Sequence, residues 1–129
     1  MVLGHQDLID MAVDGYFGSV SRGDAAHIAS LLAPECRMHV VTAGIVYEGK
    51  QEIVAHFEDF LGSYSKIQFA DFNATADEHT QKVAVRFTIA LHDGADEMTM
   101  TNCNFFTVDD QGRFTEIAIY MSDLPDKGF

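Results

Sequence analysis

The sequence predicts an α+β domain, in which helices from the first half of the chain cover one face of a curved antiparallel β-sheet. Apolar residues recur with helical spacing only in residues 1–62, and strand-like alternation follows in four successive segments of the second half. At 129 residues with 47% hydrophobic residues, the chain has the size and composition of one domain, residues 1–129, with its own core. A curved, cone-like sheet covered by three helices is expected to enclose a pocket.

The three helices are expected in the first half of the chain. An apolar stripe with helical spacing predicts the first: Leu8, Ile9, Ala12, Val13, Tyr16, Phe17 and Val20. Gly23 suits the residue after a helix, and Asp24 suits the N-cap of a second one. This second helix is short and ends at Pro34, and its apolar residues are Ile28, Leu31 and Leu32. The stretch "KQEIVAHFEDFLG", residues 50–62, predicts the third helix, whose inward face holds Ile53, Val54, Phe57, Phe60 and Leu61.

The predicted strands begin with two short segments, "CRMHVV" over residues 36–41 and "IVYEG" over residues 45–49. Four longer strands follow one another along the chain: residues 66–77, 81–92, 96–108 and 113–122. The connections "HDGAD" and "DDQG" have the Asp and Gly residues of tight hairpin turns, so an antiparallel meander is expected. The apolar residues before and after Asp71 are out of phase, which indicates a β-bulge there.

The strand over residues 96–108 carries the most informative pattern. Alternation places a mixed set of side chains on one of its faces: Met98, Met100, Asn102, Asn104 and Phe106. Burying an amide without a partner costs about 1–3 kcal/mol, so Asn102 and Asn104 need partners if this face is the inner one. Two explanations stay open: the amides bind a ligand in the pocket, or backbone groups and buried water satisfy them.

Charge and composition narrow the range of partners. The 20 acidic and 8 basic residues give a formal charge of −12, which repels phosphate backbones and anionic lipids. Neither nucleic acid nor a membrane is therefore expected as a partner. No apolar run approaches the length of a membrane span, and the N-terminus lacks the pattern of a signal peptide, so a cytoplasmic location is expected.

The sequence offers no motif for a metal or a cofactor. The 6 histidines are dispersed without an HExxH or His-x-His spacing. Cys36 and Cys103 form no CxxC pair, and both are expected as reduced thiols. No glycine-rich loop opens a helix after a strand, which is the arrangement typical of nucleotide cofactor sites. Any catalysis is therefore expected to be acid–base chemistry without a cofactor or a metal.

The order of these elements resembles the nuclear transport factor 2-like superfamily, in particular its SnoaL-like and ketosteroid isomerase-like members. The stretches that carry the resemblance are "DGYFGSVSRGD", "LLAPECRMHV", "YEGKQEIVAHF" and "NFFTVDDQGRFTEIAIYMSD", which together span nearly the whole chain. The resemblance implies the cone-like sheet and the three helices described above. The superfamily holds isomerases, cyclases, dehydratases, hydrolases and non-catalytic binding proteins, so the fold alone does not give the function.

The resemblance also implies roles for individual positions. In ketosteroid isomerases a tyrosine of the first helix lies eight residues before the aspartate of a Gly-Asp pair, and Tyr16 stands at this spacing from Asp24. A protonated aspartic acid of these enzymes corresponds to Asn104, whose amide donates a hydrogen bond at every pH. Their catalytic aspartate corresponds to Val40, which takes no proton. Tyr16 and Asn104 are thus candidate donors to a ligand oxygen, and for Tyr16 the alternative is a packed core tyrosine.

Two residues are candidates to move a proton in place of the missing aspartate. His39 has a side chain that suits general-base work near neutral pH, but on a regular strand it points away from the side of Val40. A pocket position for His39 requires a bulge, and the alternative is a surface or structural histidine. Asp123 follows the last strand and stands either at the pocket mouth or outside it as a solvated carboxylate.

Together these features favour a protein that binds a small, largely apolar, carbonyl-bearing molecule and isomerises, cyclises or dehydrates it. The candidate catalytic residues are Tyr16, His39, Asn104 and Asp123. The candidate ligand-binding residues are Val40, Phe57, Met98, Met100, Asn102, Phe106 and Met121. The alternative is a non-catalytic module of the same fold that binds a small ligand or another protein.

The other face of the strand over residues 96–108 predicts the oligomeric state. It carries Thr99, Thr101, Cys103, Phe105 and Thr107. This face is less polar than a free sheet surface usually is, and members of the superfamily commonly pair through the sheet. A homodimer through the sheet is therefore expected.

Overall fold

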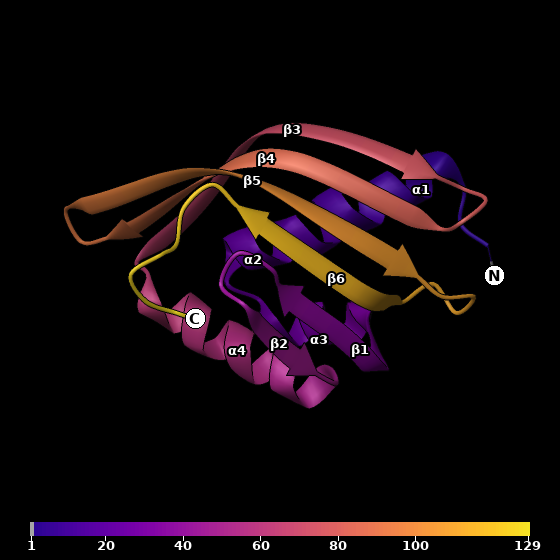
Figure 1. The fold of residues 1–129 in the computed structure, drawn as a ribbon, viewed down its shortest axis with the longest axis horizontal. Helices are drawn as coiled ribbons and strands as arrows, with labels where there is room; N and C mark the ends of the chain where they lie inside the picture. Colours follow the sequence, from indigo (N-terminus) through magenta and orange to yellow (C-terminus); the bar gives the residue numbers. More distant parts are fainter. Residues whose placement is uncertain (1) are drawn as a thin grey trace.

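The computed structural model describes residues 2–129, in which a curved sheet covers a layer of helices (Figure 1). The elements in chain order are α1 (His5–Asp10), the π-helical η1 (Met11–Phe17), α2 (Gly18–Arg22), α3 (Ala25–Leu31), β1 (Leu32–Val40), β2 (Ile45–Glu48), α4 (Lys50–Ser63), β3 (Lys66–Asp77), β4 (Lys82–Asp93), β5 (Asp96–Val108) and β6 (Phe114–Met121). The predicted α+β class is confirmed.

The first helix is continuous from α1 through η1 to α2, because the residues at the junctions keep right-handed helical backbone angles. The turns of η1 are wider than those of an α-helix, a feature that often occurs at functional sites. Gly23 ends this helix with a φ of +70°. The side chain of Asp24 then accepts a hydrogen bond from the backbone N–H of His27 at 3.0 Å. The predicted helix end and N-cap are therefore confirmed.

The second helix, α3, is shorter than predicted. It ends at Leu31, and Leu32 begins β1 with an extended backbone and pairs with Phe114 of β6. Pro34 therefore lies inside β1, before Arg37, where the pairing register shifts. A proline, which has no N–H to donate, is tolerated at such an irregularity. The placement of Leu32 on the helix was wrong because its strand partner is distant in the sequence.

In residues 2–129 the strands form one six-stranded sheet in the order β2-β1-β6-β5-β4-β3. The meander from β3 to β6 is antiparallel, as predicted. One pair departs from the predicted antiparallel sheet, since β1 runs parallel to β6. This pair joins the two short strands to the meander, so that all of them contribute to one arched sheet over the helices (Figure 1).

A β-bulge interrupts β3 at the predicted position. The pairing of β3 with β4 shifts between Ala70 and Asn73, and Asp71 has a φ of +57°. The hydroxyl of Thr88 lies 3.1 Å from both the backbone oxygen of Ala70 and the carboxylate of Asp71. Because a bulge increases the local twist of a strand, it contributes to the curvature of this half of the sheet.

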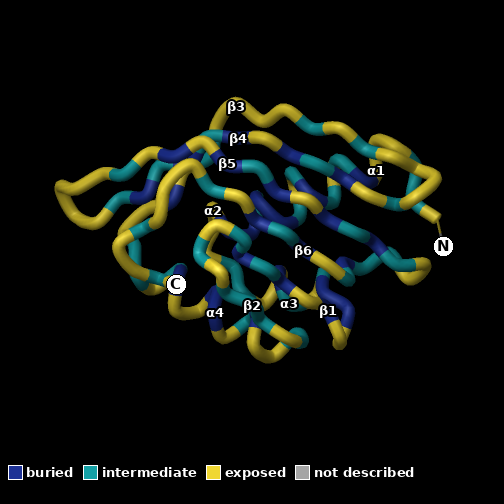
Figure 2. Tube along the Cα trace, viewed as in Figure 1, coloured by how far each residue is buried: buried dark blue, intermediate teal, exposed yellow. Residues whose placement is uncertain are grey.

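The core fills the space between the helices and the sheet, where Figure 2 shows the buried parts of the chain. Phe17 of η1 lies in this core with an exposed fraction of 1%. The centre of its ring is 4.5 Å from that of Phe87, 5.1 Å from that of Phe69 and 6.0 Å from that of Phe106. Aromatic rings from β3, β4 and β5 therefore hold the first helix against the sheet.

Residues 122–129, called here the terminal segment, run from the end of β6 to α4 (yellow in Figure 1). The hydroxyl of Tyr64 donates a hydrogen bond to the backbone oxygen of Lys127 at 2.6 Å. The ammonium group of Lys127 forms an ion pair with Asp93 at 2.8 Å. These contacts fasten the terminal segment to the end of α4 and to β4.

Candidate functional site

A cavity of about 50 Å³ lies between the first helix, α4 and the inner face of the sheet. Its lining is mostly aromatic and aliphatic, and the terminal segment contributes Pro125 and Phe129 to the wall. Polar side chains also reach it: Tyr16, His56, Asn102 and Asn104. A largely apolar cavity with a few convergent polar groups is the usual form of a small-molecule site.

The two asparagines face the cavity because β5 alternates regularly between inner and outer residues. The side-chain oxygen of Asn102 accepts a hydrogen bond from the backbone N–H of Ser122 at 3.3 Å. In contrast, the side-chain oxygen of Asn104 is buried and has no hydrogen-bond partner within residues 2–129. Asn104, whose exposed fraction is 2%, therefore brings an unpaired polar group to the cavity wall.

Tyr16 reaches the cavity from η1. Its ring packs edge-on against four neighbouring rings, among which the ring centre of Phe57 is 5.8 Å away and that of Phe106 is 5.0 Å away. Burial raises the pKa of Tyr16, so the phenol keeps its proton over the whole ordinary pH range. Tyr16 is thus a packed core residue that also lines the cavity, and its role as a hydrogen-bond donor to a ligand stays a prediction.

His56 of α4 is a cavity residue that the sequence analysis did not single out. Its exposed fraction is 6%, and its ring stacks on that of Tyr47 with a centre-to-centre distance of 4.5 Å. The ring of Phe129 lies 5.0 Å away. Its inward position could have been predicted from the sequence, since His56 stands four residues before the inward-facing Phe60 on an amphipathic helix.

The surroundings of His56 fix its charge. Burial lowers the pKa of His56 to about 4, although the nearby carboxylate of Asp59 acts in the opposite direction. The imidazole is therefore neutral at pH 7. A neutral imidazole offers one N–H donor and one basic nitrogen.

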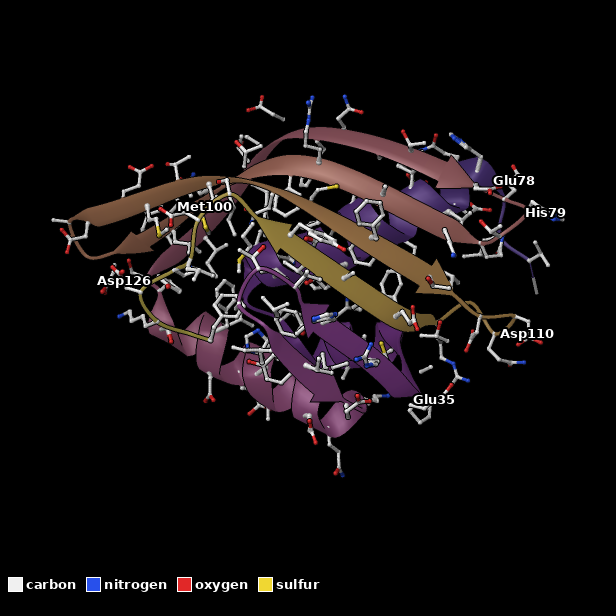
Figure 3. The ribbon with its side chains drawn as sticks, viewed as in Figure 1. Glu35, Glu78, His79, Met100, Asp110 and Asp126 are labelled. Atoms are coloured by element: carbon white, nitrogen blue, oxygen red, sulfur yellow. The ribbon has the colours of Figure 1, made fainter. Side chains whose placement is uncertain are left out.

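The residues predicted to bind a ligand divide into two groups. Those that line the cavity are Phe57, Met100, Asn102 and Met121. Met100 comes from β5, where Figure 3 labels it.

The others lie away from the cavity wall, which corrects their assignment. Val40 is fully buried in the core. Phe106 packs farther along β5, with its ring centre 4.9 Å from that of Phe114. Met98 lies toward the opposite end of β5, where it borders a separate surface depression with Tyr64. All three side chains lie on the inner face of the sheet, as the alternation predicted, but the cavity occupies only part of that face.

His39 and Asp123 are not brought into the cavity. His39 lies on the opposite face of the sheet from Val40, between Val46 of β2 and Ala118 of β6, because β1 is regular after Arg37. Asp123 lies beyond the end of β6 and is exposed, and its carboxylate accepts a hydrogen bond from the backbone N–H of Leu124 at 2.8 Å. The proposal that either residue moves a proton in the pocket is corrected on these grounds.

Two other features of residues 2–129 bear on the range of possible functions. This part of the chain contains no group of three or more histidine, cysteine, aspartate or glutamate side chains that could hold a metal ion. Among the described helices, none is long and apolar enough to cross a membrane.

Comparison with known proteins gives a family model and several solved structures. A model described as a SnoaL-like domain matches residues 13–117. AusH from Aspergillus nidulans is 14% identical, with a TM-score of 0.79 over 95% of this chain and 88% of its own. A LEH-like epoxide hydrolase from M. tuberculosis is 20% identical, with a TM-score of 0.74 over 92% of this chain and 84% of its own.

A further structural relative is the epoxide hydrolase/cyclase-like enzyme SalBIII, which acts in pyran ring formation in the polyether salinomycin. It is 16% identical, with a TM-score of 0.78 over 91% of this chain and 92% of its own. No curated protein matches the chain in sequence.

At these identities the solved structures show a shared fold and nothing more about this chain. The family model covers most of the chain, from the first helix to β6. The arched sheet over the helices agrees with that assignment. The chain therefore belongs to the SnoaL-like domain family, within the nuclear transport factor 2-like superfamily.

Proposed function

We propose that the protein binds a small, largely apolar, carbonyl-bearing molecule in the cavity, with Asn104 and Tyr16 as its polar contacts. The observation that carries this proposal is the unpaired, buried side-chain oxygen of Asn104. A buried polar group without a partner costs about 1–3 kcal/mol, so a purely structural residue at this position would be apolar. The side-chain nitrogen of Asn104 can donate a hydrogen bond to the ligand carbonyl, and its unpaired oxygen can accept one from a hydroxyl of the same ligand or from a bound water.

The size of the cavity indicates how a ligand enters. About 50 Å³ holds a few water molecules, so a larger molecule requires part of the wall to move. The terminal segment is the part best suited to move, because Pro125 and Phe129 border the cavity and its ion pair between Lys127 and Asp93 is exposed to solvent. Exposed ion pairs contribute little to stability.

The chemistry proposed for the bound molecule is isomerisation, cyclisation or dehydration without a cofactor. The names of two structural relatives, an epoxide hydrolase and an epoxide hydrolase/cyclase-like enzyme, support a small organic ligand. The second candidate function is a non-catalytic binding module. It is favoured by Val40 at the position of the family's base and by the location of His39 on the other face of the sheet.

Replacing Asn104 by leucine is expected to weaken the binding of cyclohexanone about 10-fold, because one hydrogen bond to the carbonyl is lost. NMR titration of the wild-type protein and of Asn104→Leu measures the two dissociation constants. Asn73→Leu, which makes the same substitution at an exposed position of β3, should leave the affinity unchanged. Equal affinities of wild type and Asn104→Leu would refute the proposed role of Asn104.

The homodimer through the outer face of the sheet stays a prediction. Phe105 and Tyr120 on that face have exposed fractions of 49% and 45%, and their ring centres are 5.8 Å apart. A second copy of the chain that covers this aromatic pair would remove it from water, which favours association.

A further inference from the structure

We propose that His56 is the proton-transfer residue of the cavity, and that it takes a proton from the carbon next to a ligand carbonyl held by Asn104. This inference rests on the proposed function and extends it from binding to catalysis. His56 lines the same cavity as Asn104 and Tyr16, and its side chain is nearly fully buried. His56 is thus an ionisable side chain that lines the cavity, which His39 and Asp123 do not.

The position of His56 suits a molecule bound between two walls. His56 comes from α4, whereas Asn104 comes from β5 and Tyr16 from η1. A ligand that fills the cavity therefore contacts the helix side through the imidazole and the sheet side through the amide. The stacking of His56 on Tyr47 holds the imidazole ring in one orientation.

His56 also has a way to exchange its proton with solvent. The same side chain lines a surface groove formed by α4, β2 and the terminal segment, together with Tyr47, Glu52, Asp59 and Phe129. The imidazole therefore stands in the wall between the cavity and the groove. A proton taken from a ligand on one side can pass to water on the other, which returns the base to its neutral form.

The proposed step moves one proton from the ligand to His56 and needs no other reactant. The C–H bond next to the carbonyl breaks, its proton goes to the basic nitrogen of His56, and its electron pair forms the enolate. The negative charge that develops on the carbonyl oxygen is stabilised by the N–H₂ of Asn104 and the O–H of Tyr16. Return of the proton from His56 to the same carbon restores the ketone, and its return to the far carbon of a conjugated enolate gives the isomer.

The ionisable groups around His56 agree with the role of a base. Asp59 on α4 favours the protonated imidazolium, and Glu52 on the same helix and Tyr47 on β2 border the groove. Burial outweighs Asp59 and lowers the pKa of His56 to about 4, so at pH 7 the imidazole is neutral and has one nitrogen without a proton.

Deuterium exchange tests this assignment without knowledge of the natural substrate. Cyclohexanone is incubated with the protein in D₂O, and the loss of its α-proton signal is followed by NMR, with the rate in buffer subtracted. We expect protein-dependent exchange in the wild type and a loss of about 100-fold or more in His56→Phe, which keeps a stacking ring. The affinity for cyclohexanone should change little.

The control is His79→Phe, since His79 lies in the turn between β3 and β4, far from Met100 of the cavity wall (Figure 3). Its exchange rate should equal that of the wild type. In the wild type the rate should rise with pH through about 4, and in His56→Gln, the second variant, this rise should be absent.

The outcomes separate the two proposals. Binding without exchange in the wild type, or unchanged exchange in His56→Phe or His56→Gln, would overturn the role of His56 and leave the binding function intact. If the wild type exchanges the ketone but Asn104→Leu binds it equally well, the role of Asn104 fails instead. No binding of the ketone to the wild type would overturn both.

Discussion

Lowering the pH from 7 to 4 is expected to destabilise the wild-type protein by about 3 kcal/mol relative to the His56→Phe variant. The reason is the pKa of His56, which burial lowers from an ordinary value of 6.5 to about 4 in the folded protein. Below pH 6.5 the unfolded chain binds a proton at His56 that the folded protein does not bind. The free energy of unfolding therefore falls as the pH decreases from 6.5 toward 4, and this loss levels off below 4.

Urea unfolding at several pH values, with wild type and variant measured side by side, checks this result. Comparison with His56→Phe cancels the contributions of the carboxylates that the two proteins share. His79→Phe serves as the matched control because His79 is exposed, and it should keep the pH dependence of the wild type. If wild type and His56→Phe lose stability in parallel, His56 is not buried as described.

The two asparagines of β5 are expected to respond in opposite directions to the same substitution. Asn104→Leu should stabilise the protein by about 1–2 kcal/mol, because it removes a buried polar atom without a partner within residues 2–129. Asn102→Leu should destabilise it by about 1 kcal/mol, because the backbone N–H of Ser122 loses its acceptor. A residue whose removal stabilises the fold and weakens binding is kept for function rather than for stability.

Thermal or urea unfolding of the two variants measures this contrast. Asn73→Leu, at an exposed position of β3, is the reference for the substitution itself and should lie within about 0.5 kcal/mol of the wild type. The interpretation would be wrong if Asn104→Leu were the more destabilised of the two, since Asn104 would then have a structural partner.

The alternation of side chains along the strands and their spacing along the helices were enough to predict which side chains face inward and where β3 is irregular. The alternation along β5 placed Asn102 and Asn104 on the inner face, and the change of phase in β3 located the bulge at Asp71. The same alternation showed that a regular β1 would turn His39 outward, which is what the structure has. His56 could have been found in this way, because its helical spacing from Phe60 is as clear as that of the apolar residues.

The remaining features depend on contacts between distant parts of the chain. The pairing of Leu32 with Phe114 starts β1 earlier than Pro34 suggests, and no local signal announces it. The terminal segment closes one side of the cavity, so the extent of the cavity could not be read from the alternation of β5 alone. Which of the two amides is paired is decided by the backbone of Ser122, at the beginning of that segment.

The carbonyl stretching frequency of bound cyclohexanone tests the central claim most directly. A hydrogen bond to the ketone oxygen lowers this frequency, and a carbon-13 label on the carbonyl separates its band from those of the protein in the infrared spectrum. We expect a lower frequency in the wild-type complex than in a dry apolar solvent, and a return toward the solvent value in Asn104→Leu. The same frequency in the two complexes, or a value in the wild type equal to that in the apolar solvent, would contradict it.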